Sequence, residues 1–185
     1  MINGESETGI TLFKMDRGVD SGPIVGQKSE PIWNDDMIDT LYERIELRGI
    51  ELIEWYLPLL AFGSVKMKPQ DESKRRVMPQ RGPEGGLINW NEKAAQISRF
   101  IRAQTHPYPG AFTLLNGKKL HIWQAEIVEE SVSKDDIGYV QRNVEDESYS
   151  VVCHSDKIMP KVVEYEGVNY GRGQLRQLFQ GGSKS

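Results

Sequence analysis

Cysteine and histidine are scarce in this sequence of 185 residues, which has one cysteine and three histidines. A single cysteine excludes an internal disulfide, and such usage fits a reducing cytoplasm. Cys153 lies in an alternating run over 149–153, where a small half-buried side chain in a strand explains it better than a nucleophile. No His, Cys or acidic cluster has the spacing of metal ligands, so we expect no metal site.

Long apolar runs are also absent. The longest stretch, Trp55 to Phe62, is far shorter than the roughly 20 residues that a bilayer requires. The N-terminus has no basic region followed by an apolar core, so no export signal is predicted. With 38% hydrophobic and 27% charged residues, the composition is typical of a soluble globular protein.

Clusters of basic residues are few. The formal net charge is −4, and the adjacent basic groups are Lys74-Arg75-Arg76 and Lys118-Lys119. Both groups are typical of solvated loop charges. A protein that grips an RNA backbone usually presents many clustered Lys and Arg, because phosphate contacts supply most of the affinity. Charge therefore favours a small acceptor over RNA, although a basic face could still be assembled in space.

The first half of the chain predicts two strands, a long helix and a loop. Glycine-bracketed β-formers predict a strand around 11–15 and a second strand at 24–27. Residues 34–36 offer an N-cap for the helix, which Pro58 should kink or end. The expected inward side chains are Leu41, Ile45, Leu52, Tyr56 and Leu59 or Leu60, and those expected to face water are Glu43, Glu46, Arg48 and Glu51. Residues 63–86 predict a long surface connection whose length hints at a binding loop.

The second half predicts one helix followed by strands. Asn91 is expected to cap a helix over 92–104, with inward side chains Ala94, Ile97 and Ile101. Residues 111–128 predict a hairpin around Asn116-Gly117, a dipeptide that favours a type I′ turn. Further strands at 138–143, 148–154 and 158–165 would complete a small barrel or an open sheet.

Asp20 stands in a glycine-bracketed turn between the first two strands. Gly22 lets the backbone pass close to a ligand or adopt a positive φ. As a bare tripeptide, Asp20-Ser21-Gly22 is typical of an ordinary turn. The residues around it favour a functional site, because an acid placed after a strand in this way can reach a cleft.

Four ordered blocks carry a resemblance to a known family: ETGITLFKMDRGVDSG at 7–22, PQDES at 69–73, INW at 88–90, and IRA at 101–103 with PYPGAF at 107–112. They resemble the formyltransferases that use 10-formyltetrahydrofolate, which include methionyl-tRNA formyltransferase and the sugar-nucleotide N-formyltransferases. Any one block alone would be weak, but their shared order makes chance similarity improbable. The resemblance implies an α/β part followed by a β part. Residues 1–105 would be the C-terminal portion of a Rossmann-like catalytic domain with its linker, 106–180 a small OB-like β-barrel, and 181–185 a disordered tail.

The resemblance also implies the site and its ligands. Asp20 would be catalytic, 10-formyltetrahydrofolate the co-substrate, and the turn residues Val19, Ser21, Gly22 and Ile24 its contacts. Arg102 and Tyr108 would lie on the acceptor side, although Tyr108 could equally plug the core. The implied acceptor is an amino-sugar nucleotide, as in lipopolysaccharide biosynthesis, with methionyl-tRNA as the alternative; a homodimer is possible.

Part of the family's catalytic set is missing. The family pairs its Asp with an Asn-x-His motif, and none of His106, His121 and His154 has Asn two residues before it. Residues 1–5 resemble the end of a family helix, so we expect a fragment or a truncated product that is inactive by itself. A second alternative is a binding module in which the catalytic half has decayed.

Overall fold

The computed structural model describes residues 1–78 and 82–179, and the chain divides into two compact units. Residues 5–80 form what we call the hairpin unit, and residues 1–4 with 81–185 form the sheet unit. The division predicted after residue 105 differs from this one, because the helix at Ala94–Gln104 packs against the sheet that follows it. The predicted disordered tail at 181–185 lies outside the described residues.

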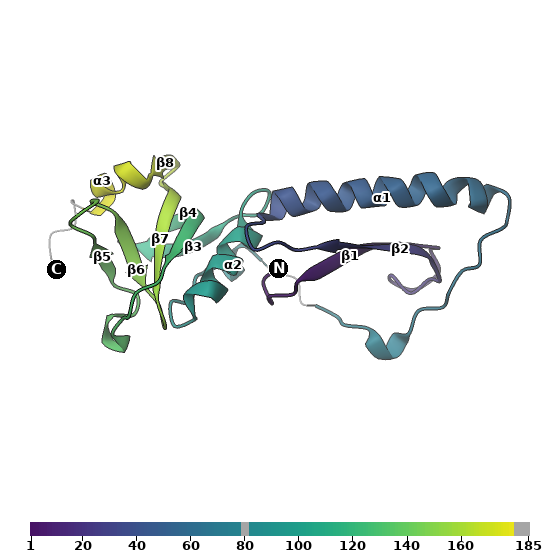
Figure 1. The fold of residues 1–185 in the computed structure, drawn as a ribbon, viewed down its shortest axis with the longest axis horizontal. Coiled ribbons are helices and arrows are strands. Elements are labelled where there is room, and N and C mark those ends of the chain that lie inside the picture. The colour runs from purple at the N-terminus through teal and green to yellow at the C-terminus, as the bar shows by residue number, and fades with distance from the viewer. Residues whose placement is uncertain (79–81, 180–185) are drawn as a thin grey trace. The chain divides into compact units, whose positions relative to one another are not determined.

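The described part of the hairpin unit contains two antiparallel strands, one long helix and a short 3₁₀ helix at Glu72–Lys74 (Figure 1). β1 (Glu7–Phe13) pairs with β2 (Ile24–Pro31), from Glu7 opposite Pro31 to Phe13 opposite Ile24. α1 (Ile38–Ala61) lies along the hairpin and buries Leu41 and Leu52 against it. The expected inward face of the helix is confirmed, since Ile45, Tyr56, Leu59 and Leu60 are partly buried as well.

Gly26 explains how Tyr56 packs onto β2. A Cβ atom at Gly26 would come within 2.2 Å of the Tyr56 ring. Real Cβ atoms do not approach a ring so closely, so the ring needs a strand position without a side chain. The absence of a side chain at Gly26 therefore sets how closely α1 approaches the hairpin.

One expectation for α1 is wrong, and one of the two effects expected of Pro58 does not occur. The N-cap is Met37, not one of residues 34–36, because the Asp36 carboxylate instead accepts hydrogen bonds from the Trp33 N–H (2.8 Å) and the Arg44 guanidinium (2.6 Å). Pro58 does not end the helix, which continues to Ala61. A proline has no N–H and so removes one backbone hydrogen bond of the helix. Because Pro58 lies in the last turn, the helix continues for only three residues after it.

A chain of ion pairs joins α1 to β2, and it involves Arg48 and Glu51, which were expected to face water. Glu30 on β2 is 2% exposed and accepts from Arg44 Nε and Arg48 Nε, both at 2.8 Å. Arg48 also pairs with Glu51, and Glu51 pairs with a lysine of β2, Lys28. Buried charges are tolerated only when they are paired and hydrogen-bonded. A buried carboxylate on β2 therefore requires these arginines on the facing turns of the helix.

The sheet unit holds six strands in one curled antiparallel sheet, a half-barrel (Figure 1). The order is β3-β4-β7-β6-β5, with β8 also paired to β7. The strand bounds are β3 Ala111–Leu115, β4 Lys118–Val128, β5 Val140–Arg142, β6 Tyr149–Val152, β7 Lys157–Tyr165 and β8 Val168–Gly171. The predicted hairpin is confirmed: Leu115 pairs with Lys118, and Asn116 and Gly117 have φ of 52° and 76°, the left-handed region that a type I′ turn requires.

α2 (Ala94–Gln104) covers the sheet, and its predicted inward residues Ala94, Ile97 and Ile101 are buried. The cap expected at Asn91 is instead Lys93, whose N–H donates to the Gln96 side chain at 3.3 Å. β8 was not predicted, because it is short and contains Asn169 and Gly171. The last described element is α3 (Arg176–Phe179), which was also not predicted, and Leu175 just before it is fully buried in the core.

Candidate functional site

The acid turn, which we define as residues Lys14–Pro23 between β1 and β2, is held by local hydrogen bonds. The Lys14 N–H donates to the Pro23 carbonyl at 3.0 Å and closes the loop. Inside it, the Asp16 carboxylate accepts from the Gly18 N–H at 2.9 Å and from the Ser21 hydroxyl at 2.8 Å. A Cβ atom at Gly22 would lie 1.7 Å from the Lys14 carbonyl oxygen. Gly22 was expected to pass close to a ligand or to adopt a positive φ; its φ is not positive, and the close approach is to the chain's own Lys14 carbonyl.

Asp20 occupies the tip of the acid turn in a left-handed conformation, with φ of 53°. Asp is one of the few residues besides Gly that tolerates this region. Its carboxylate is exposed and bonds to no side chain or backbone group in the described part of the chain. A carboxylate in this state is free to accept a proton or to orient a cationic partner.

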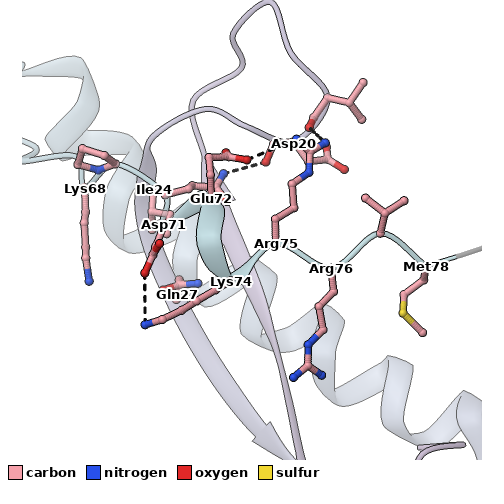
Figure 2. A pocket seen from close by; sticks show the side chains of 14 residues that line it. Asp20, Ile24, Gln27, Lys68, Asp71, Glu72, Lys74, Arg75, Arg76 and Met78 are labelled. Carbon is pink, nitrogen blue, oxygen red and sulfur yellow. Dashed lines mark hydrogen bonds and ion pairs between the residues drawn. The ribbon is translucent and has the colours of Figure 1, made fainter.

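A pocket of about 650 Å³ lies beside this turn, within the hairpin unit (Figure 2). One wall is formed by Val19, Asp20 and Ile24. A second wall is formed by residues of the segment Lys68–Met78, which follows α1 in the chain and is bridged to Ile24. The sequence indicated a binding loop in this region only from its length, and the antiparallel bridge between Ile24 and Lys68 is what brings it beside the turn.

Charged side chains surround the pocket. Its cations are Lys68, Lys74, Arg75 and Arg76, and its acids are Asp20, Asp71 and Glu72. Lys74 pairs with Asp71 at 3.6 Å and Arg75 with Glu72 at 3.4 Å, both at exposed positions. Ser73 donates two hydrogen bonds to Asp71, which together with Lys74 lower the pKa of that carboxyl. An anionic ligand would find a net positive wall facing a single free carboxylate.

Of the five residues predicted for this site, Val19, Asp20 and Ile24 line the pocket, whereas Ser21 and Gly22 are not among its lining residues. Val19 is 75% exposed at the pocket, which suits an apolar contact with a flat ligand ring. The carbonyls of Val19, Asp20 and Gly22 already accept hydrogen bonds from Arg75 and Gln70. Gln70 is a site residue that the sequence did not single out. Only its place in the PQDES block could have pointed to it.

Arg102 and Tyr108 belong to the sheet unit. Arg102 is half-buried in the last turn of α2. Tyr108 is 39% exposed and follows a cis peptide between His106 and Pro107. It does not plug the core. Arg99, three residues before Arg102 on α2, is half-buried, and its Nε atom is buried without a hydrogen-bond partner in the described residues.

The remaining candidate nucleophile and bases have other roles. Cys153 is completely buried, and burial raises the pKa of its thiol to about 12. His106 and His121 stack against Trp123, with ring centroids at 4.0 Å and 5.6 Å. All three histidines lie in the sheet unit, outside the acid turn. In the described ranges, no group of three His, Cys, Asp or Glu side chains could hold a metal ion, and no helix is long and apolar enough to cross a membrane.

Comparison with known families accounts for both units. Residues 1–54 match the family model described as formyl transferase, and residues 82–170 match the model described as formyl transferase, C-terminal domain. The chain belongs to the formyl transferase family. In this formyl transferase chain, the acid turn lies within the first match, and Arg102 and Tyr108 lie within the second.

The formyl transferase chain has curated relatives about twice its length. It is 34% identical over 167 residues to methionyl-tRNA formyltransferase of Geobacter sulfurreducens, covering 90% of this chain and 51% of the relative. The chain thus spans about half the length of the curated relatives it matches.

Solved structures share the fold of this formyl transferase chain at low identity. HypX from Aquifex aeolicus in complex with tetrahydrofolic acid matches with a TM-score of 0.71 and 19% identity, over 95% of this chain and 31% of that one. The N-formyltransferase from Helicobacter canadensis, in complex with folinic acid and dTDP-3-aminofucose, matches with a TM-score of 0.59 and 20% identity. That second match covers 86% of this chain and 57% of the other.

Proposed function

We propose that the chain serves formyl transfer from 10-formyltetrahydrofolate to a primary amine, with Asp20 as the catalytic carboxylate of the hairpin unit. The observation that carries this proposal is the exposed carboxylate of Asp20, which has no partner among the described residues and is held at the tip of a turn that lines a pocket of about 650 Å³. Family membership supplies the reaction class, and the tetrahydrofolate named for the Aquifex structure supports a folate co-substrate. In the same proposal, the hairpin unit is part of a Rossmann-like domain and the sheet unit is an OB-like module.

In this reaction the amine attacks the formyl carbon and gives a tetrahedral oxyanion, which collapses to an N-formyl product and tetrahydrofolate. Such a reaction needs an oxyanion stabiliser and a proton acceptor. Asp20 would take the proton of the amine or balance the charge of the histidine that the family resemblance implies. Val19, Ser21, Gly22 and Ile24 would contact the pterin ring, through the apolar side chains of the first and last and through backbone groups of the turn.

Binding of folinic acid, a stable formylated folate, tests the folate part of the proposal. Calorimetric titration of the purified chain should show saturable binding. Val19→Asp places a second carboxylate in the apolar wall, and we expect it to weaken binding by about tenfold or more, because an unpaired charge is costly to desolvate. Val168→Asp, at an exposed position of the sheet unit, is the matched control. Absence of saturable binding by the wild-type chain would contradict the proposal.

The acceptor is proposed to be the amino group of an amino-sugar nucleotide, contacted through Arg102 and Tyr108. Support comes from charge: the chain is net −4, and RNA binding depends on many phosphate contacts. The dTDP-3-aminofucose named for the Helicobacter enzyme shows that a protein of this fold can take such a ligand. Arg102 offers a planar guanidinium for a diphosphate, and Tyr108 offers a ring for stacking.

Methionyl-tRNA is the second candidate acceptor, and the observation in its favour is the 34% identity to the Geobacter methionyl-tRNA formyltransferase. A salt titration distinguishes the two. A tRNA complex should lose affinity by about a thousandfold or more between 50 and 200 mM salt if six or more phosphates are contacted. A nucleotide sugar, with two phosphates, should lose far less. Binding of initiator tRNA with the steep dependence, and no saturable binding of an amino-sugar nucleotide, would decide for tRNA.

A further inference from the structure

The side chain of Gln70, which lies outside the acid turn, forms two hydrogen bonds to the backbone of the turn. The Gln70 amide nitrogen donates to the carbonyl oxygen of Asp20 at 2.8 Å and to that of Gly22 at 2.7 Å. A side-chain amide has two N–H donors, and Gln70 donates both of them to carbonyl oxygens of the turn. The two carbonyls belong to the residues on either side of Ser21, so the two hydrogen bonds span the tip of the turn.

The position of Gln70 is itself fixed by its neighbours. Two residues earlier, Lys68 forms a two-way backbone bridge with Ile24, with N–H···O distances of 2.7 Å and 2.8 Å. One residue later, Asp71 accepts hydrogen bonds from the Ser73 N–H and hydroxyl and caps a short 3₁₀ helix at Glu72–Lys74. Gln70 is half-buried between these two anchors. Its amide is thus presented to the turn by an ordered segment.

The tip of the turn needs support of this kind. A left-handed conformation of a residue other than glycine costs about 1–2 kcal/mol relative to the ordinary regions. The bonds inside the turn reach Lys14, Asp16, Gly18, Ser21 and Pro23. Among the residues that the structure describes, Gln70 is the one that bonds the backbone of Asp20. Loss of Gln70 would leave the left-handed conformation of Asp20 without a direct restraint.

We propose that Gln70 is a positioning residue for Asp20, holding the carbonyls of Asp20 and Gly22 so that the Asp20 carboxylate and the turn keep a single conformation at the pocket. This inference rests on the proposed function, because it assigns Gln70 a role in the same site. Gln70 acts through the turn and not on the reacting atoms. The weaker contact of Arg75 with the Val19 carbonyl, at 3.4 Å, extends the same support by one residue.

Two measurements on the full chain test this role. Gln70→Met keeps the length and volume of the side chain and removes both donors. Gln124→Met, at an exposed position of β4 in the sheet unit, is the matched control. Backbone ¹⁵N relaxation should give order parameters near about 0.85 for the amides of Asp20, Ser21 and Gly22 in the wild type, and below about 0.6 in Gln70→Met. The strands β1 and β2 should keep their values in both variants.

The second measurement is the affinity for folinic acid, which we expect to fall about tenfold in Gln70→Met and to stay unchanged in Gln124→Met, as for two lost hydrogen bonds. Unchanged order parameters in Gln70→Met would overturn the proposal. So would loosened order parameters with unchanged affinity, because Gln70 would then be merely structural. If the wild-type chain bound no folinic acid, the proposed function would fail, and the order parameters alone would decide whether Gln70 holds the turn.

Discussion

Three carboxylates of the hairpin unit lie in two different environments: Glu30 and Asp36 are buried against α1, and Asp20 is exposed beside the pocket. Glu30 and Asp36 are 2% and 4% exposed, and both are tied to arginines of α1. Asp20 is exposed and has no side-chain partner among the described residues. The pairing of Glu30 with Arg44 and Arg48 could not be predicted from sequence, because residues 14 and 18 positions apart meet only once the strand and helix pack.

Replacing Asp36 tests the buried network. Asp36→Asn removes the charge that Arg44 faces, and we expect the free energy of unfolding to fall by about 2 kcal/mol, as for a lost hydrogen bond to a charged group. Asp35→Asn, at the neighbouring exposed position, should stay within about 0.5 kcal/mol of the wild type. Urea denaturation followed by circular dichroism measures both. Equal effects of the two substitutions would show that the network contributes nothing specific.

The same network predicts sensitivity to acid. Arg48 and Arg44 lower the pKa of Glu30 from its ordinary value of 4.5, and Arg44 lowers that of Asp36 from 3.8. A carboxyl whose pKa is lower when folded stabilises the protein above its unfolded pKa and loses that contribution as the pH falls through the folded pKa. The hairpin unit should therefore lose stability progressively below about pH 4.5. A thermal midpoint that stayed constant from pH 6 to pH 3 would contradict this.

At the scale of elements, the spacing of apolar residues predicted most helices and strands correctly. The capping residues predicted from sequence placed the N-terminal ends of α1 and α2 wrongly. The apolar spacing in α1 and α2 identified the buried faces, and the Asn116-Gly117 turn fixed the β3–β4 hairpin. Both helix starts were wrong by one to three residues. The expected capping side chains, Asp36 and Asn91, are adjacent to turns that use them differently: Asp36 binds Arg44, and the Asn91 N–H donates to Asn89. A cap depends on local competition among polar groups that spacing alone does not resolve.

Ile101 tests the packing of α2 on the sheet. It is 1% exposed and belongs to the core shared with Ile122, Ile158 and Val163. Ile101→Ala leaves a cavity beneath the helix, and we expect a loss of about 2–5 kcal/mol in the free energy of unfolding of the sheet unit. Leu114→Ala, at a position 58% exposed on β3, is the control and should cost far less. A similar urea midpoint for both variants would contradict the proposed core.

At the scale of the whole molecule, the sequence indicated the family and part of the candidate site. The ordered sequence blocks identified the acid turn, because its residues are contiguous and can be recognised by comparing sequences alone. They did not identify the pocket, since its second wall, Lys68–Met78, contacts β2 and the turn through residues far apart in sequence: the bridge between Ile24 and Lys68, and the hydrogen bonds from Gln70 and Arg75 to the turn carbonyls. Nor did they indicate that residues 1–4 group with the sheet unit. Contacts between distant segments are set by packing, which a motif does not encode.

The absence of the family's catalytic histidine from this sequence predicts a low rate of formyl transfer. Asp20 can accept a proton, but an oxyanion needs hydrogen-bond donors aimed at it, and no histidine of this sequence stands in the Asn-x-His motif that the family resemblance implies. Loss of one oxyanion donor costs about 100- to 1000-fold in turnover. The purified chain should therefore form N-formyl product at least about 100-fold more slowly than the Geobacter relative under the same conditions. Mass spectrometry of formylated acceptor, with 10-formyltetrahydrofolate and either methionyl-tRNA or an amino-sugar nucleotide, measures this. Asp20→Asn should lower any residual rate further. Turnover equal to that of the relative would mean that another group of this chain stabilises the oxyanion.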